Sequence, residues 1–273
     1  MLPQLYILVA SNMNNFFIQR FYAFAYANCA TDSLNLDKAL SASDRFFSMV
    51  PTDKINYQDH KLRGTIYQKK AQDSLAILAF EQAASMNDIA YNELTNNLIK
   101  LYNKNKMYEK LILAYEVRRQ KNGKLLAQEE YDLGKAYYFG RNDYQAADSI
   151  FQVVIKNDST YVPAHIYRGR SNYKMDTNNE KWMAFPHYLK VTEIVKPEDR
   201  SQASKKAFVL ESLRYVADYY SKSSNKDLDK AKKYFEEILV IEPTDANAKK
   251  ALGIKDPVPA PTTTPKPAAP VRN

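Results

Sequence analysis

The sequence is poor in the residues that build disulfides and metal sites, since it has one cysteine and three histidines among 273 residues. The lone Cys29 excludes a disulfide within the chain, and isolated histidines offer no cluster of metal ligands. Long hydrophobic runs are also missing, because no stretch reaches the roughly 18 apolar residues that a membrane-spanning helix needs. The sequence therefore predicts a chain that holds no metal or cofactor and does not span a membrane.

The start of the chain carries no clear export signal. Residues 1–11 are largely apolar but lack a preceding basic region, and Tyr26-Ala27-Asn28 before Cys29 matches a lipoprotein cleavage site poorly. The compartment is therefore left open. It is the cell envelope or periplasm if the chain is part of a longer exported protein, and the cytoplasm otherwise.

Catalytic motifs are missing as well. There is no His-Glu-x-x-His zinc helix and no Gly-x-Ser-x-Gly nucleophile turn. The segment from Gly134 to Gly140, followed by Arg141, is only superficially similar to a phosphate-binding loop. Its spacing is one residue too long, and no Lys-Ser or Lys-Thr pair follows. We therefore expect neither enzyme activity nor a small-molecule substrate.

The charge balance is moderately basic. Lys and Arg total 39 against 31 Asp and Glu, which gives a net charge of +8. This charge favours acidic partners, but Asp and Glu are interspersed and no dense Lys/Arg tract is present. Binding of nucleic acid or another anionic polymer is therefore the alternative function, and not the first one.

What the sequence does contain is a spaced pattern of small and aromatic residues. Gly64, Tyr67, Ala76, Phe80 and Ala83 recur as Gly134, Tyr137, Ala147, Phe151 and Val154, and more loosely as Gly169, Ala184, Tyr188 and Val191. The step from Gly134 to Gly169 is 35 residues, and the step from Gly64 to Gly134 is twice that. A period of about 34 residues made of two helical stretches is typical of the tetratricopeptide repeat (TPR). The chain resembles a TPR protein over residues 20–253, although the Trp near the start of each family repeat is absent.

The resemblance implies an all-α fold, a right-handed α-α superhelix of helical hairpins. The expected hairpins are 20–53, 57–88, 91–123, 127–159, 162–197 and 210–243, with an enlarged turn at 175–180 in the fifth. Residues 244–253 are expected to form a capping helix, and residues 1–19 an N-terminal helix or an incomplete repeat. Residues 254–273 hold six of the twelve prolines, and this composition predicts a disordered tail.

Repeated glycines predict close contacts between helices. Gly64, Gly134, Gly169 and Gly253 fall at the same position of a first helix. A glycine inside a helix costs about 0.5–1 kcal/mol relative to alanine, so its repetition indicates close approach of the paired helix. We expect the glycines to face Ala76, Ala147, Ala184 and Ala231, while Phe80, Phe151, Tyr188 and Phe235 fill the space between neighbouring hairpins.

The resemblance also implies a binding face, because the first helix of each TPR hairpin lines the concave side of the superhelix. The residues nominated there are Tyr131, Lys135, Tyr138, Tyr167, Arg170, Tyr173, Lys174 and Arg214. Tyrosine offers a large contact area with a polar tip, and arginine binds carboxylates through paired hydrogen bonds. We therefore expect a protein-interaction scaffold whose groove binds an extended or helical protein segment that carries acidic residues.

A more specific family activity is not expected. Some TPR domains clamp a C-terminal carboxylate with Lys, Asn and Arg residues from three consecutive repeats. Lys61 and Asn96 match two of those positions, but Thr65, Gln128 and Asp132 stand where Asn and basic residues are needed. The clamp is broken in this chain.

Overall fold

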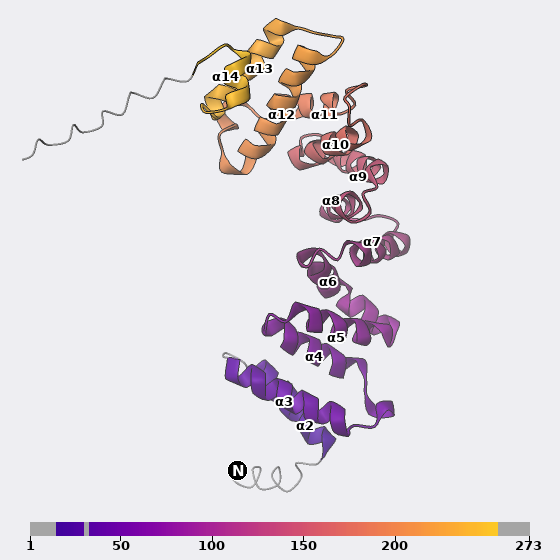
Figure 1. Ribbon diagram of the computed structural model, residues 1–273. Coiled ribbons are helices and arrows are strands. Elements are labelled where there is room, and N and C mark those ends of the chain that lie inside the picture. Colours follow the sequence, from indigo (N-terminus) through magenta and orange to yellow (C-terminus); the bar gives the residue numbers. More distant parts are fainter. Residues whose placement is uncertain (1–14, 30–32, 256–273) are drawn as a thin grey trace, which may run out of the picture. The chain divides into compact units, whose positions relative to one another are not determined.

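In the computed structural model, residues 15–29 and 33–255 are described, and all the regular secondary structure within these ranges is helical (Figure 1). The all-α fold expected from the repeat pattern is confirmed. The chain divides into two compact units, residues 1–150 and residues 151–273. Each unit is a stack of helices with its own buried core, and each is described by itself.

The first unit is a succession of helices that pack against their neighbours in the chain. Its helices are α2 (Phe16–Asn28), α3 (Ser33–Met49), α4 (Tyr57–Lys69), α5 (Asp73–Ser85), α6 (Asp88–Lys104), α7 (Tyr108–Asn122), α8 (Ala127–Ala136) and the first part of α9 (Tyr144–Asn157). A 3-10 turn at Thr52–Lys54 precedes α4, and a π-helical turn at Tyr137–Arg141 extends α8. Because α2 packs on α3, α4 on α5 and α5 on α6, the hairpins stack in chain order (Figure 1).

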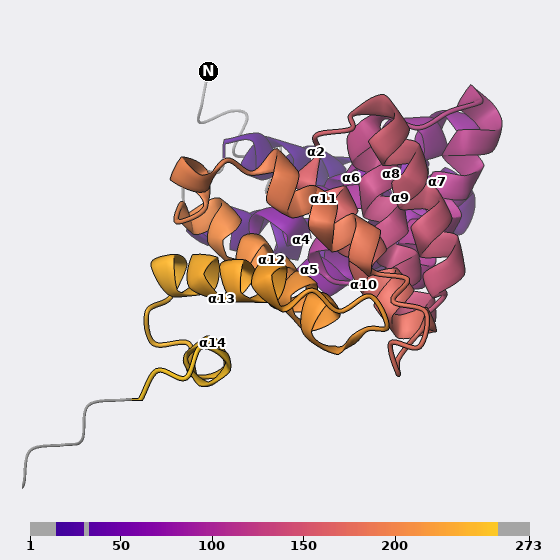
Figure 2. The same ribbon diagram turned by 90° about the horizontal axis from the view of Figure 1, so that it is seen from above.

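The second unit begins within α9 and is also helical. It continues with α10 (Val162–Met175), α11 (Phe185–Ile194), a 3-10 turn at Pro197–Asp199, α12 (Ala203–Lys222), α13 (Leu228–Ile241) and α14 (Ala246–Ala251). Helix α12 packs against both α11 and α13. The short α14 lies beside α13 (Figure 2).

Polar side chains at helix starts fix where several helices begin. Asn56 accepts a hydrogen bond from the backbone N–H of Gln58 (2.9 Å), while the carboxylate of Asp59 accepts one from the N–H of Asn56 (2.9 Å). These contacts satisfy backbone donors that the first turn of α4 leaves without a helical partner. At the other end of a helix, Gly123 terminates α7 with a φ of +73°, a left-handed conformation that glycine adopts most easily.

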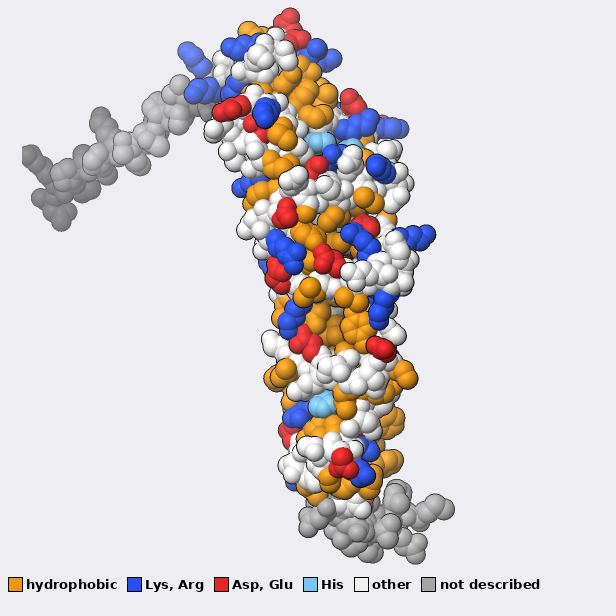
Figure 3. All heavy atoms as spheres, turned by 90° about the vertical axis from the view of Figure 1, so that its right-hand side faces the viewer, with side chains coloured by type: hydrophobic (Ala, Val, Ile, Leu, Met, Phe, Trp, Pro, Cys, Tyr) orange, Lys and Arg blue, Asp and Glu red, His pale blue; other side chains and the backbone are white. Residues whose placement is uncertain are grey.

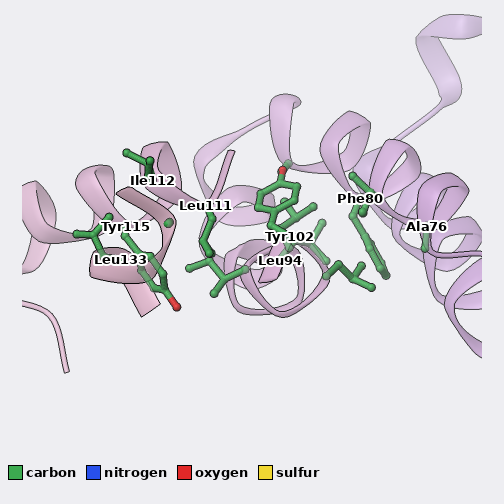
Figure 4. Close-up of a cluster of buried hydrophobic side chains, with 14 of the residues drawn as sticks. Ala76, Phe80, Leu94, Tyr102, Leu111, Ile112, Tyr115 and Leu133 are labelled. Carbon is green, nitrogen blue, oxygen red and sulfur yellow. The ribbon is translucent and has the colours of Figure 1, made fainter. Parts of the chain in front are cut away.

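Buried side chains from successive helices form the core of the first unit. They run from Ala76 and Phe80 on α5 through Leu94 and Tyr102 on α6 and Leu111, Ile112 and Tyr115 on α7 to Leu133 on α8 (Figure 4). The second unit has a separate cluster from α10 to α14. Because a fully buried Leu or Phe stabilises the fold by about 1.5–3 kcal/mol, these contacts between chain neighbours hold each stack together.

Aromatic rings, and not alanines, lie closest to two glycines of first helices, Gly64 and Gly169. A Cβ atom added to Gly64 would lie 2.6 Å from Cδ1 of Phe80, and one added to Gly169 would lie 2.9 Å from Cζ of Tyr188. The expectation that Ala76 faces Gly64 and that Ala184 faces Gly169 is therefore corrected, while Phe80 also belongs to the buried cluster that α5 shares with α6. In each case the ring of the second helix packs flat on the backbone of the first helix of the same hairpin. Any residue larger than glycine at that position would collide with the ring.

Several boundaries differ from the expected ones. The expected break between residues 19 and 20 falls inside α2, which begins at Phe16 because the Asn15 side chain caps it. Helix α12 begins at Ala203 and not at residue 210. The connection between α10 and α11 covers residues 176–184, longer than the expected 175–180.

The C-terminal end also needs correction. Gly253 does not lie inside a helix, because α14 ends at Ala251 and Gly253 follows it with a φ of +69°. It resembles Gly123 in ending a helix and has no ring against it. The predictions for residues 1–14 and for the tail from residue 256 onward lie outside the described residues.

The contact at Gly64 predicts that Gly64→Ala destabilises the first unit. The added methyl group would overlap the Phe80 ring, and such overpacking costs about 1–3 kcal/mol. Alanine gains only about 1 kcal/mol over glycine inside a helix. We therefore expect a lower free energy of unfolding in urea. The loss should shrink in a Phe80→Leu background, and a penalty that stays the same there would contradict the contact.

Candidate functional site

The residues nominated from the sequence fall into two groups, one in each unit. Tyr131 and Lys135 lie on α8 and Tyr138 on the π-helical turn that follows it, all in the first unit. The second unit holds the remaining residues: Tyr167, Arg170, Tyr173 and Lys174 on α10, and Arg214 on α12.

The group on α8 is partly engaged within the protein. The ammonium of Lys135 lies 5.2 Å from the centre of the Tyr131 ring and pairs with Asp132 at 3.6 Å. The half-buried ring of Tyr138 packs edge-on against Phe139 and Tyr144, with centroid distances of 5.0 and 5.2 Å. Tyr131, Lys135 and Tyr138 are therefore each only partly exposed to a binding partner.

Arg170 is held by an internal carboxylate. Its Nε and Nη2 donate hydrogen bonds of 2.9 and 2.6 Å to the two oxygens of Glu211, which also accepts one of 2.8 Å from the Tyr188 hydroxyl. The hydrogen bonds that Arg170 donates to Glu211 raise the pKa of Arg170 above its usual range. Tyr167 is buried beneath the guanidinium, whose carbon lies 5.0 Å from its ring centre. An acidic ligand at Arg170 would have to displace Glu211.

Arg214 has a similar internal role. It donates to Asp245 from Nε (2.9 Å) and Nη2 (2.7 Å), and also to Glu242 (2.5 Å). Asp245 is buried and caps α14 by accepting a hydrogen bond of 2.8 Å from the N–H of Ala248. Arg214 therefore ties α12 to the start of α14.

Tyr173 and Lys174 remain exposed at the end of α10. The Tyr173 ring packs edge-on against Tyr215, which also contacts Trp182 from the connection at residues 176–184. Burial raises the pKa of Tyr215, so its hydroxyl stays protonated and donates a hydrogen bond of 2.6 Å to Asn179. The ring cluster fastens the long connection onto α12.

A pocket in the first unit was not nominated from the sequence. It has a volume of about 480 Å³ and is formed by α6, the last turns of α7, the connection after it and the start of α8. Its lining includes Tyr91, Asn92 and Asn96 from α6, Val117, Arg118 and Lys121 from α7, Lys124, Leu125 and Leu126 from the connection, and Glu129 from α8.

The pocket combines cations with apolar surface. Arg118, Lys121 and Lys124 face a single acidic lining residue, Glu129, which pairs with Arg118. Lys121 lies 4.6 Å from the centre of the Tyr91 ring, while Lys124 has no ion-pair partner among the residues that the structure describes. Leu126 is 71% exposed at the pocket. This arrangement suits a ligand that carries both a negative charge and an apolar group.

Reasoning from the sequence missed this pocket because it considered first helices only. The cations here come from α7, a second helix, and from the connection around Gly123. The signal that was available is the pair Asn92 and Asn96, which are four residues apart and therefore share one face of α6. Of the two clamp positions that matched, Lys61 pairs with Glu93, and Asn96 lies in the pocket.

Other kinds of site are not found in the described part of the chain. Within residues 15–29 and 33–255, no group of three or more His, Cys, Asp or Glu side chains could hold a metal ion. No helix in those ranges is long and apolar enough to cross a bilayer. The face in Figure 3 shows basic and acidic side chains alternating with hydrophobic ones, without a continuous field of one sign.

Comparison with known proteins identifies solved structures with a similar fold. No protein-family model matches the sequence, and no curated protein matches it. Among solved structures, the C-terminal part of a TPR repeat-containing protein from Cytophaga hutchinsonii is 27% identical with a TM-score of 0.59, over 90% of this chain and 91% of that one. A chain in the structure of Naa15/Naa10 bound to HypK-THB is 16% identical with a TM-score of 0.60, over 92% of this chain and 36% of that one. This chain thus spans about a third of the length of that second protein.

The contacts of Asp245 predict that Asp245→Ala releases α14 selectively. The substitution removes both the cap of α14 and the main partner of Arg214, and loss of a cap alone costs about 1 kcal/mol. We expect faster hydrogen exchange at the amides of residues 246–251, with little change in the first unit. Glu242→Ala is the matched control, because it leaves the cap and the Asp245 contact in place. Equal exchange in the two variants would contradict the anchoring role.

Proposed function

Because the chain is a tetratricopeptide repeat protein, we propose that it is a non-catalytic scaffold that holds a segment of another protein. Stacked helical hairpins expose an extended row of side chains, and such surfaces serve to bind other proteins. The segment that fits best carries acidic residues and docks in the pocket between α6, α7 and α8.

The observation that carries this proposal is the unmatched charge of the pocket. Three cations line it against one carboxylate, and that carboxylate already pairs with Arg118. Lys121 and Lys124 are exposed and lie beside the apolar side chains of Leu125 and Leu126. Buried apolar contact supplies affinity at a protein interface, and the charges select the partner.

The surfaces nominated from the sequence contribute less to the proposal. Arg170 and Arg214 have their guanidinium groups occupied by Glu211 and by Asp245 with Glu242. Replacing either arginine would leave a carboxylate without its partner and disturb the fold. Among the nominated residues of the second unit, Tyr173 and Lys174 are the exposed ones that a partner can reach without breaking such an ion pair.

We therefore predict that Lys121→Ala/Lys124→Ala loses partner proteins that the native chain retains. The test is affinity capture by the full chain from an extract of its own cells, with quantitative mass spectrometry. Tyr173→Ala/Lys174→Ala is the control, since it also changes exposed residues at the end of a helix. It removes one lysine outside the pocket, where the pocket variant removes two. We expect partner recovery to fall at least tenfold for the pocket variant only.

The opposite result would be equally informative. Loss in the Tyr173→Ala/Lys174→Ala variant alone would place the partner on α10, as the sequence predicted, and would contradict the pocket. Equal recovery by all three proteins would show that neither surface holds the partner.

A further inference from the structure

Two asparagines of the pocket are oriented by neighbouring cations. Arg118 donates from Nη2 to Oδ1 of Asn96 at 2.8 Å, and Lys121 donates from Nζ to Oδ1 of Asn92 at 3.5 Å. Arginine and lysine can only donate, so each amide must turn its oxygen toward the cation and its NH₂ group away from it. Neither NH₂ group has a hydrogen-bond partner among the residues that the structure describes. The two amides are thus prepared to donate to a ligand.

The spacing of these donors matches one kind of backbone. Asn92 and Asn96 are one turn apart on α6, which corresponds to a rise of roughly 6 Å along the helix. In an extended chain, residues on the same side repeat every two positions, at roughly 6.6–6.8 Å. Carbonyl groups of alternate residues in an extended segment can therefore meet the two amides. The interior of a helical segment could not supply them, because its carbonyls already accept hydrogen bonds within the helix.

The other lining residues indicate which side chains the bound segment carries. Lys121 and Lys124 flank Gly123, while Leu125 and Leu126 follow directly in the connection. A carboxylate satisfies the two ammonium groups, and a neighbouring apolar side chain covers Leu126, because Leu125 is already buried in the core. Successive side chains of an extended segment point to opposite sides, so an acidic and an apolar residue at adjacent positions can each face one part of the pocket.

We propose that the α6–α7–α8 pocket recognises an extended peptide segment in which an acidic residue adjoins an apolar one. The amides of Asn92 and Asn96 bind its alternate carbonyls, and Lys121 and Lys124 bind its carboxylate. This inference rests on the proposed scaffold function and names the chemistry of the segment. It also separates the pocket from a site for nucleic acid, whose phosphates would use the cations but not Leu126.

The test uses the immobilised full chain and three libraries of eight-residue peptides. The fourth residue is fixed as Asp, Asn or Lys, the fifth is Leu, and the other positions vary. We expect the Asp library to bind about tenfold more tightly than the Asn library, as one charge-assisted hydrogen bond predicts. The Lys library should bind least. Lys121→Ala/Lys124→Ala should abolish the preference for Asp, and Lys174→Ala, which removes a lysine outside the pocket, should preserve it.

The backbone contacts need a second variant. Asn92→Asp/Asn96→Asp keeps oxygens that Arg118 and Lys121 can bind, but replaces the two free donors with acceptors. We expect it to weaken even the Asn library by tenfold or more, because the carbonyls of the peptide lose their donors. Unchanged binding of that library would overturn the role of the asparagines.

The remaining outcomes separate this inference from the scaffold function. Equal binding of the Asp, Asn and Lys libraries would overturn the inference but leave protein capture by the full chain untouched. A random oligonucleotide that displaces the Asp library and needs Lys121 and Lys124, with affinity falling steeply in salt, would assign the pocket to nucleic acid. Binding of no library, together with protein capture that ignores the pocket, would contradict both proposals.

Discussion

The close contact between an aromatic ring and the bare backbone of its paired helix sets the spacing of the helices. Phe80 lies over Gly64 in the first unit, and Tyr188 lies over Gly169 in the second. Each glycine brings the backbones together at the middle of a hairpin, where a side chain would force them apart. Because each helix buries its apolar side mainly against chain neighbours, this local contact decides which residues of a first helix turn inward and which remain accessible.

The packing of neighbouring helices also decides which charged side chains pair with one another inside the protein. Several arginines that point away from the core meet a carboxylate from a neighbouring helix, as Arg170 meets Glu211 and Arg214 meets Asp245. These pairs use up the groups that would otherwise attract a partner. The net charge of +8 therefore says little about where a partner binds. What matters is which cations lack an internal carboxylate, and in the α6–α7–α8 pocket those are Lys121 and Lys124.

The fold could be predicted from the sequence because the repeat encodes contacts between near neighbours. Spaced glycines, alanines and aromatic residues identify hairpins without knowledge of distant contacts. The contacts within a hairpin were harder to predict from the sequence. The ring of Phe80, and not Ala76, faces Gly64, and the spacing of the two residues does not show which of them makes the contact. The pocket could not be predicted in full. It depends on the left-handed turn at Gly123, which brings residues of a second helix and of a connection to the face of α6.

The end of α7 also positions one of the cations of the pocket. Lys121 lies in the last turn of α7, where the carbonyl ends of the helix carry roughly half a negative unit charge. This partial charge and the face of Tyr91 hold the ammonium in place before a ligand arrives, so less side-chain freedom is lost on binding. The same helix end would repel an anion. Three cations outweigh that half charge and the carboxylate of Glu129 together, so the pocket still attracts a carboxylate. The carboxylate of the ligand is therefore expected to lie beside Lys121 and Lys124.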